Sequence, residues 1–290
     1  MSGLNSAALT LAAAVATVTP LAAQSRPGGG DSFIDVGESK IYFEECGSGP
    51  DAVLLVHDGV VHSRVWDGVW PAFCRHGHTI RYDRRGYGKS TAATKWFSET
   101  DDMAAVLRQA GVTRATIVGS SHGGEISIDF TLEHPDLVRR LVLVGAVVGG
   151  FPYTEHFLNR NTAMSEPLRR GDVAAGARSV SNDRYLIAPG NDEARKKLLD
   201  LLLAAPQDLT HSTPALPSKP ALPRLGEIRV PTLILVGDAD IPDVHAHAGA
   251  IEAGIPRSKR IVIPGTGHIM YLEKPDVFAR TVLAFLDANP

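Results

Sequence analysis

Short apolar runs alternate with longer amphipathic stretches along most of the chain. Seven of these runs have the length and composition of buried strands: 39–45, 52–57, 79–82, 115–118, 140–144, 232–236 and 259–263. Patterns with helical periodicity follow at 100–110, 124–133, 245–253 and 276–286. Strands separated by helices imply βαβ units, so the sequence predicts an α/β fold built on a doubly wound, mostly parallel sheet.

The alternation stops in the middle of the chain, between residues 149 and 223, where there is no convincing strand. Three helical patterns separated by glycine and proline take its place: 154–171, 172–180 and 191–205. The proline-rich stretch PALPSKPALPRL then leads back to an apolar strand pattern. We therefore expect a core in two parts, with a helical insertion between them: 31–148, 149–223 and 224–290.

The first 30 residues differ from the rest in composition. Residues 7–23 are apolar and uncharged, Pro20 interrupts them, and a glycine-rich spacer follows. A run this short resembles a signal peptide more than a membrane span, so we expect a leader over 1–30, no membrane span, and export to the periplasm or the medium. Because no Lys or Arg precedes the run, a cytoplasmic protein with a frayed leader is the alternative.

Charge, cysteines and histidines exclude several classes of function. Hydrophobic residues at 44% and charged residues at 21% are typical of a globular protein, and a formal net charge of −3 without a basic stripe predicts that it binds no nucleic acid. Cys46 and Cys74 lack the CxxC spacing of zinc sites, and we expect two half-buried small side chains, with a disulfide as the alternative. His245 and His247 have no third ligand at a zinc-like spacing, so we expect solvated side chains and no metal.

The stretch VGSSHGGE carries the clearest chemical signal. Gly119 and Gly123 lie two residues before and two after Ser121, which completes a GxSxG pattern that Ser120 does not meet. A strand pattern precedes this group and a helical pattern follows it, so the central residue must turn sharply, and small neighbours relieve the crowding. The pattern predicts Ser121 as a nucleophile at the carboxyl end of the sheet, where α/β proteins bind ligands.

A serine nucleophile needs a base, and that base needs an acid to orient it. His268 follows a strand pattern and a glycine-rich turn, so its loop should emerge at the same sheet edge as Ser121. Asp240, in LILVGDADIPD, is the expected acid, and Asp238 is the alternative. His122 is adjacent to Ser121, but neighbouring side chains in such a turn point apart. We expect its backbone N–H to serve as an oxyanion donor and its ring to pack or to line a pocket.

A second oxyanion donor is expected in the loop after the strand AVLLV. Gly59 allows the backbone to approach a ligand closely, so its N–H is the predicted partner of the His122 amide. His57 in the same loop is expected to bond backbone groups and to hold the turn.

In combination, these stretches resemble the α/β-hydrolase superfamily. The matching segments occur in the family's order: LLVHDG, YDRRGYGKS, IVGSSHGG, HPDLVRRLVLVG, VPTLILVGDADIP and PGTGHIMYLEKPDVF. The chain is similar in particular to small-capped bacterial carboxylesterases, enol-lactone hydrolases, cofactor-free perhydrolases and meta-cleavage C–C hydrolases. The resemblance implies that the insertion 149–223 is a small helical cap placed after the sixth strand. Asp58 stands where the family usually has glycine, which leaves Val60 as an alternative oxyanion donor.

We therefore expect a serine hydrolase that cleaves carboxylic esters or lactones through an acyl-enzyme on Ser121, without a metal or organic cofactor. A C–C bond hydrolase or a perhydrolase would use the same triad, and a small-molecule receptor is the alternative of another class. Candidate pocket residues in the insertion are Tyr153, Phe157, Met164 and Leu186, unless they form the insertion's own core. The expected partner is a small ester or lactone, and the expected state is a monomer or homodimer.

Overall fold

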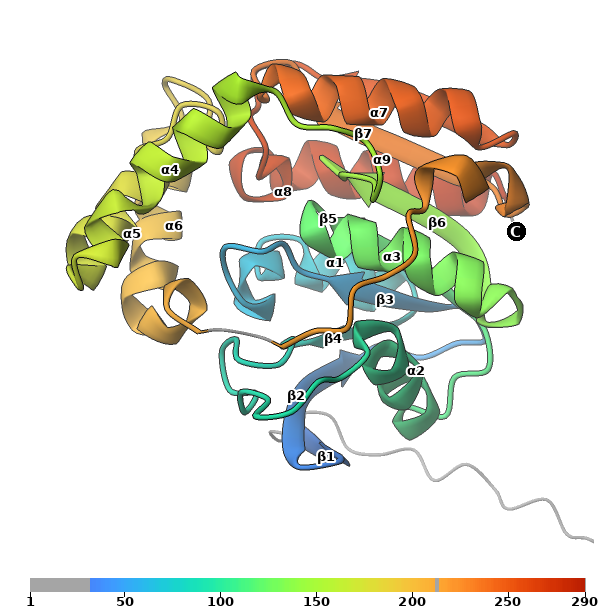
Figure 1. The fold of residues 1–290 in the computed structure, drawn as a ribbon. Helices are drawn as coiled ribbons and strands as arrows, with labels where there is room; N and C mark the ends of the chain where they lie inside the picture. The colour runs from blue at the N-terminus through green and yellow to red at the C-terminus, as the bar shows by residue number, and fades with distance from the viewer. Residues whose placement is uncertain (1–31, 212–213, 290) are drawn as a thin grey trace, which may run out of the picture.

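The computed structural model describes residues 32–211 and 214–289, and the expected leader at 1–30 lies outside them (Figure 1). The strands of this part of the chain are β1 (Ser32–Val36), β2 (Ser39–Cys46), β3 (Ala52–Val56), β4 (His78–Tyr82), β5 (Ala115–Ser120), β6 (Val138–Val144), β7 (Thr232–Gly237) and β8 (Ser258–Ile263). They form one sheet in the order β1-β2-β4-β3-β5-β6-β7-β8. The β1–β2 and β2–β4 pairs are antiparallel, and the other pairs are parallel, as the doubly wound prediction requires.

Helices cover both faces of the sheet. They are α1 (Trp70–His76), α2 (Glu99–Gln109), α3 (His122–Glu133), α7 (Pro242–Gly254), α8 (Met270–Glu273) and α9 (Pro275–Asp287), with short 3₁₀ helices at η1 (Ser63–Trp66), η2 (Pro135–Leu137) and η4 (Leu222–Glu227). Successive residues of a strand point to opposite faces. Leu54 and Ile117 accordingly join one hydrophobic cluster with α2, α3 and α7. Val53 and Val118 join the other cluster, with α1 and α9.

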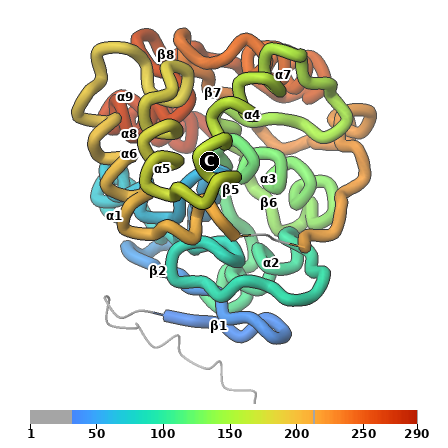
Figure 2. The backbone as a smooth tube through the Cα atoms, turned by 60° about the vertical axis from the view of Figure 1, so that its left-hand side comes forward, coloured from blue at the N-terminus to red at the C-terminus, as the bar shows by residue number. Residues whose placement is uncertain are grey.

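The insertion after β6 is helical, as predicted. It contains α4 (Glu155–Arg169), α5 (Val173–Ser181), α6 (Asp192–Ala204) and η3 (Pro206–Leu209). These helices form a lobe at one end of the sheet, on the left of Figure 1, and Figure 2 brings that side forward. Ala177 and Leu198 anchor α5 and α6 in the second hydrophobic cluster, whereas α4 has no buried residue. The Thr154 N–H and hydroxyl both bond to Asp243, which attaches the start of α4 to α7.

The hydrophobic pattern does not predict two elements of the structure, the strand β1 and the helix α1. β1 alternates exposed and buried positions at the sheet edge, so it lacks the apolar run of a central strand. α1 has only seven residues and begins with a tryptophan and a proline, which is too short for a helical period to be recognised. With β1 included, Val138–Val144 is the sixth strand of the chain, and the helical insertion follows it.

The expectation of two unpaired cysteines is wrong. Cys46, at the end of β2, and Cys74, in α1, form a disulfide with their Cα atoms 5.3 Å apart. The bond ties the antiparallel side of the sheet to a helix that packs on α9. The pairing depends on α1, so it could not be predicted while that helix was missing. Within the described residues, no helix has both the length and the apolar composition needed to cross a bilayer.

Candidate active site

The turn between β5 and α3 holds Ser121 in a strained conformation. Ser121 has φ 54° and ψ −119°, and it is the one non-glycine residue with positive φ in the described part of the chain. Such a backbone costs about 1–3 kcal/mol. Glycines make the turn possible: a Cβ at Gly119 would collide with Ser127 Oγ, and one at Gly123 would collide with the carbonyl oxygen of His57. The GxSxG spacing is therefore a steric requirement of this turn.

The two serines of the doublet have different surroundings. Ser120 is fully buried, and its hydroxyl bonds to the Tyr271 hydroxyl at 3.1 Å. Ser121 is partly exposed, its side chain caps no helix, and its N–H donates to Val144 O at 2.9 Å. Only Ser121 is thus available to a ligand at the carboxyl end of the sheet.

His268 and Asp240 meet at the same sheet edge. His268 Nδ1 lies 2.9 and 3.1 Å from the two carboxylate oxygens of Asp240, and both residues are buried. Asp238, the alternative acid, instead accepts hydrogen bonds from the Gly265 and Thr266 amides. Burial alone would lower the pKa of His268, but the charge of Asp240 and the hydrogen bond to it outweigh burial and raise this pKa above 6.5.

Gly145 brings the Ser121 and His268 loops together. It directly follows Val144, whose carbonyl accepts the Ser121 N–H, and it has φ +53°. A Cβ at Gly145 would lie 2.9 Å from His268 Nδ1 and 3.3 Å from Asp240 Oδ2. The imidazole and the carboxylate therefore pack against the end of the strand that holds the Ser121 turn.

The His268 loop is hydrogen-bonded to the helical insertion. The His268 N–H donates to Tyr185 O at 2.8 Å, and the Ile269 N–H donates to Leu186 O at 3.1 Å. A Cβ at Gly267 would lie 2.5 Å from Tyr185 O, so only glycine permits this approach. Glu273 adds a second link, because its carboxylate accepts the amides of both Gly267 and Ala188.

The two expected oxyanion donors lie side by side. A Cβ at Gly59 would be 3.5 Å from His122 Cβ, and the Tyr87 hydroxyl holds the Gly59 carbonyl at 3.0 Å. In the described residues the Gly59 N–H donates no hydrogen bond, and the His122 N–H, at the first position of α3, has no intrahelical acceptor. The Val60 N–H is already bonded to Asp58 Oδ1 at 2.6 Å.

The His122 ring lies between two carboxylates. Its Nδ1 is 3.1 Å from Glu125 Oε2, and its Nε2 is 3.3 Å from Glu99 Oε2. Burial lowers the pKa of His122 and the charge of Arg84 lowers it further, but the two carboxylates outweigh both and raise it. Because both ring nitrogens are engaged, this ring is not placed to accept a proton from Ser121. Arg84 itself is buried and paired with Glu99 at 2.6 Å.

The histidines at 57, 62 and 247 are structural. His57 is fully buried, accepts the Arg84 N–H at 2.9 Å and contacts the Asp58 carbonyl, which matches its expected role in the loop. His62 pairs with Asp208 of η3 at 2.6 Å and so joins the β3 loop to the insertion. The expectation of a solvated His247 is wrong, because its ring is fully buried against Phe151 and Tyr153.

The four candidate pocket residues fall into two pairs. Tyr153 and Phe157 stack with ring centroids 4.3 Å apart at the start of α4, and Phe157 packs on the cluster beside Asp240 that includes Ile241 and Val244. Leu186 belongs to the second hydrophobic cluster, together with residues of α5 and α6, and the partly buried Met164 packs against that cluster. The backbone of Leu186 also contacts the His268 loop.

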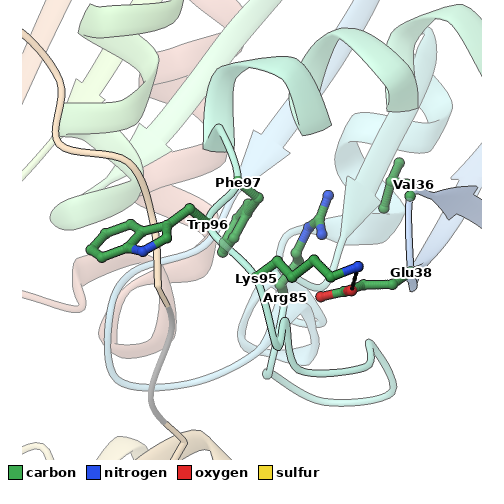
Figure 3. A pocket seen from close by; sticks show the side chains of 7 residues that line it. Val36, Glu38, Arg85, Lys95, Trp96 and Phe97 are labelled. Carbon is green, nitrogen blue, oxygen red and sulfur yellow. Dashed lines mark ion pairs between the residues drawn. The ribbon is translucent and has the colours of Figure 1, made fainter.

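A separate pocket of about 470 Å³ contains none of the candidate residues. It lies beside the β1–β2 turn and is lined by Val36, Gly37, Glu38, Arg85, Lys95, Trp96 and Phe97. Its charges are already paired: Lys95 binds Glu38, as Figure 3 shows, and Arg85 binds Asp102 through two hydrogen bonds. Across the described residues, no group of three potential ligands could hold a metal ion.

Comparison with known proteins identifies the family. A family model described as the alpha/beta hydrolase fold matches residues 51–275, which is most of the chain. The chain belongs to the α/β-hydrolase fold family. The eight-stranded order and the flanking helices of this α/β hydrolase agree with that assignment.

Several relatives of this α/β hydrolase have named activities. It is 28% identical over 276 residues, covering 88% of the chain and 94% of the relative, to a 2-hydroxy-6-oxononadienedioate/2-hydroxy-6-oxononatrienedioate hydrolase of Klebsiella pneumoniae. It is 26% identical to a pimeloyl-[acyl-carrier protein] methyl ester esterase of Nitrosomonas europaea, covering 83% and 97% of the two chains. An esterase structure from Exiguobacterium antarcticum superposes with a TM-score of 0.76 at 25% identity, covering 89% and 99%.

Some residues around the site of this α/β hydrolase were not recognised in the sequence. Gly145 follows an apolar strand, a signal shared by many glycines, and only the fold reveals its contact with His268. Glu273 and Tyr271 lie in the MYLEKP segment, where nothing in the pattern marks their long-range bonds. Asp58 did carry a signal, because glycine is the usual residue at its position.

We predict that Gly145→Ala impairs activity by displacing the His268 ring. Both the strained φ and the added Cβ contribute, and a displacement of about 1 Å can cost on the order of 100-fold in rate. Gly111→Ala is the matched control, since Gly111 also has positive φ, +70°, but no atom lies within 4 Å of the added Cβ. Each variant should lose about 1–2 kcal/mol of unfolding free energy.

Denaturant unfolding and steady-state kinetics of the two variants separate these effects. Equal loss of activity in Gly111→Ala and Gly145→Ala would contradict a specific role for the Gly145 contact.

Proposed function

We propose that the protein is a serine hydrolase that cleaves carboxylic esters or lactones through an acyl-enzyme on Ser121. The observation that carries this proposal is the placement of the strained Ser121 turn and the His268–Asp240 pair against the same strand end, at Gly145. This is the combination of nucleophile, base and acid that acyl transfer needs.

The reaction has two steps, both carried by the same groups. His268 Nε2 removes the proton of Ser121 as Oγ attacks the carbonyl carbon, and the Gly59 and His122 amides stabilise the oxyanion. The imidazolium then protonates the leaving alcohol, and the acyl group stays on Ser121. Water, deprotonated by His268, attacks this ester, and the imidazolium returns the proton to Ser121 Oγ as the acid is released. Asp240 holds the imidazole in position and stabilises its positive charge.

The surroundings favour a substrate without a carboxylate near the reacting carbonyl. Arg84 is paired with Glu99, and Arg160 of α4 forms two hydrogen bonds with Asp183. Neither arginine therefore offers an unpaired charge to an anionic substrate. The methyl ester esterase and the Exiguobacterium esterase among the relatives also support ester chemistry.

We assign the insertion, residues 149–223, to a cap over the site. The hydrogen bonds from the His268 loop to Tyr185 and Leu186 support this role, because they bring the insertion to the edge where the acyl group would bind. Tyr153, Phe157, Met164 and Leu186 are the proposed wall residues.

Carbon–carbon bond hydrolysis is the second candidate. The Klebsiella relative supports it, since 2-hydroxy-6-oxononadienedioate contains no ester and its hydrolysis must break a C–C bond. Arg84 and Arg160 are each paired with a carboxylate, which makes them less suited to bind such a dianion. A ring-opened diketone in the substrate panel below distinguishes the two reactions.

We predict that Ser121→Ala abolishes both fluorophosphonate labelling and turnover of p-nitrophenyl esters, while circular dichroism shows the same fold. His122→Ala is the matched control: its backbone amide remains and its ring makes no proton transfer, so its loss of activity should be much smaller. The panel includes p-nitrophenyl esters of increasing chain length, lactones and a ring-opened diketone.

Labelling that persists in Ser121→Ala would contradict the nucleophile. Labelling of the wild type with no turnover of any substrate would contradict the hydrolase proposal and would favour a receptor.

We predict that the acidic limb of the kcat/KM profile lies above pH 6.5. His268 acts as a base only when neutral, and its pKa is raised, so activity appears as pH rises through that raised value. Asp240→Asn should lower kcat on the order of 10⁴-fold and shift the limb to lower pH. Asp238→Asn keeps an oxygen acceptor for the Gly265 and Thr266 amides and should change neither greatly. Equal effects of the two substitutions would contradict Asp240 as the acid.

We propose that the protein is exported, because the Cys46–Cys74 disulfide adds to the signal-like leader. Disulfides persist in oxidising compartments and are rare in the cytosol.

The bond closes a loop of 28 residues, and loss of a crosslink of this length costs about 3–4 kcal/mol. We therefore expect the free energy of unfolding of a Cys46→Ala/Cys74→Ala variant, measured by denaturant titration, to be lower than that of the wild type by that amount. Free thiols at both positions in protein isolated from its own host would contradict export.

A further inference from the structure

Each of the three loops proposed to carry chemistry has a buried polar neighbour that the mechanism does not use. Asp58 precedes Gly59, Ser120 precedes Ser121, and Tyr271 lies three residues after His268. All three polar side chains are fully buried. A buried carboxylate is costly unless hydrogen bonds satisfy it, so its presence requires an explanation.

The three side chains form one hydrogen-bond chain. Asp58 Oδ2 accepts the Tyr271 hydroxyl at 2.7 Å, and the Tyr271 oxygen lies 3.1 Å from Ser120 Oγ. A phenol has one hydrogen, and the carboxylate is the stronger acceptor. Tyr271 therefore donates to Asp58 and accepts from the Ser120 hydroxyl. This hydrogen-bond chain links loops that lie up to 213 residues apart in the sequence.

The other oxygen of Asp58 closes the turn around Gly59. Asp58 Oδ1 accepts the Val60 N–H at 2.6 Å and the Val61 N–H at 3.0 Å. These bonds occupy the two amides after Gly59 and leave the Gly59 N–H as the unbonded one of the three among the described residues. The carboxylate thus selects which amide of the loop can face a ligand.

Packing fixes the position of the Tyr271 hydroxyl. Its ring stacks on Trp66 with centroids 4.0 Å apart and meets Phe278 edge-on at 5.6 Å. Burial, followed by the charge of Asp58, raises the pKa of Tyr271 well above 10, so the phenol stays protonated and remains a donor.

We propose that Asp58 and Tyr271 are a positioning pair that holds the Gly59 amide in register with Ser121. This inference rests on the proposed function, because it assigns Gly59 as an oxyanion donor. Neither residue touches the substrate; both act through the backbone of Gly59. Aspartate at the position where the family usually has glycine is thereby explained, since glycine could accept neither the two amides nor the tyrosine.

The charge of Asp58 also acts on the base. Burial lowers the pKa of His268, the charges of Asp240 and Asp58 outweigh it and raise this pKa, and the charge of Arg160 of α4 lowers it. Neutralising Asp58 therefore lowers the pKa of His268, whereas removing the Tyr271 hydroxyl leaves the Asp58 charge in place.

The experiment compares Tyr271→Phe and Asp58→Asn with the wild type. Tyr82→Phe is the matched control, because Tyr82 is equally buried but is not a member of the hydrogen-bond chain of Asp58, Tyr271 and Ser120. For a p-nitrophenyl ester we expect kcat to fall about tenfold in Tyr271→Phe and about 30- to 100-fold in Asp58→Asn, with KM within about twofold. Affinity for a boronic acid, which mimics the tetrahedral intermediate, should fall by the same factors. Asp58→Asn should also shift the acidic limb of kcat/KM to lower pH, and Tyr271→Phe should not.

Tyr271→Phe keeps the stacked ring, so it tests the proposal even if Asp58→Asn does not fold. Wild-type kcat and boronic acid affinity in Tyr271→Phe would overturn the proposal, as would an equal loss in Tyr82→Phe. Amide hydrogen exchange of residues 57–61 gives a readout that needs no activity: exchange should be faster in Tyr271→Phe, and unchanged exchange would contradict the link. If the wild type hydrolyses no ester, the proposed function fails, while the exchange measurement still decides whether the pair holds the loop.

Discussion

The crowded turn between β5 and α3 is the constraint on which the rest of the site depends. The chain must change from strand to helix within one residue, and Ser121 absorbs that change at φ 54°. The turn is compact because Gly119 and Gly123 have no side chains where Ser127 and the His57 carbonyl approach. Because the backbone of residues 56 and 57 fills the space at Gly123, the serine cannot relax without moving the β3 loop. Strain and packing therefore place the hydroxyl, with no hydrogen bond needed to direct it.

The surrounding loops are arranged to match this fixed point. The Asp240 and His268 loops reach it across Gly145, where a side chain would push the imidazole away. In the β3 loop, Asp58 accepts two amides, and the third amide, that of Gly59, has no hydrogen bond to any described residue. Both loops are held by buried groups at hydrogen-bond distance, so the proposed site would be preorganised. Reorganisation at the moment of reaction is the cost that such an arrangement avoids.

The residues found from sequence are those whose constraint is local. Ser121 is marked by glycines within two positions, and the strands by runs that must be apolar on both faces. Asp240 and His268 follow such strands, so their sheet edge could be inferred. β1 and α1 have weak local patterns, because β1 lies at the sheet edge and α1 has only seven residues. The disulfide and the burial of His247 depend on partners outside the local pattern: the disulfide needs α1, and His247 is covered by Phe151 and Tyr153 of the insertion.

The hydrogen-bond chain of Asp58, Tyr271 and Ser120 could not be predicted from the sequence pattern. Its members are unremarkable types in the segments VHDG, GSSH and MYLE, and only the folded chain brings them within 3.1 Å. The departure from glycine at position 58 was visible, but its meaning depended on a tyrosine more than 200 residues away.

The bonds from Tyr185 and Leu186 to the His268 loop have an evolutionary consequence. Here the segment between α5 and α6 supplies the carbonyls that hold the loop of the proposed base. Recombination at the two ends of the insertion would therefore also replace the carbonyls that hold the loop of the proposed base. With the proposed roles of cap and base, substrate preference and proton transfer would be inherited together.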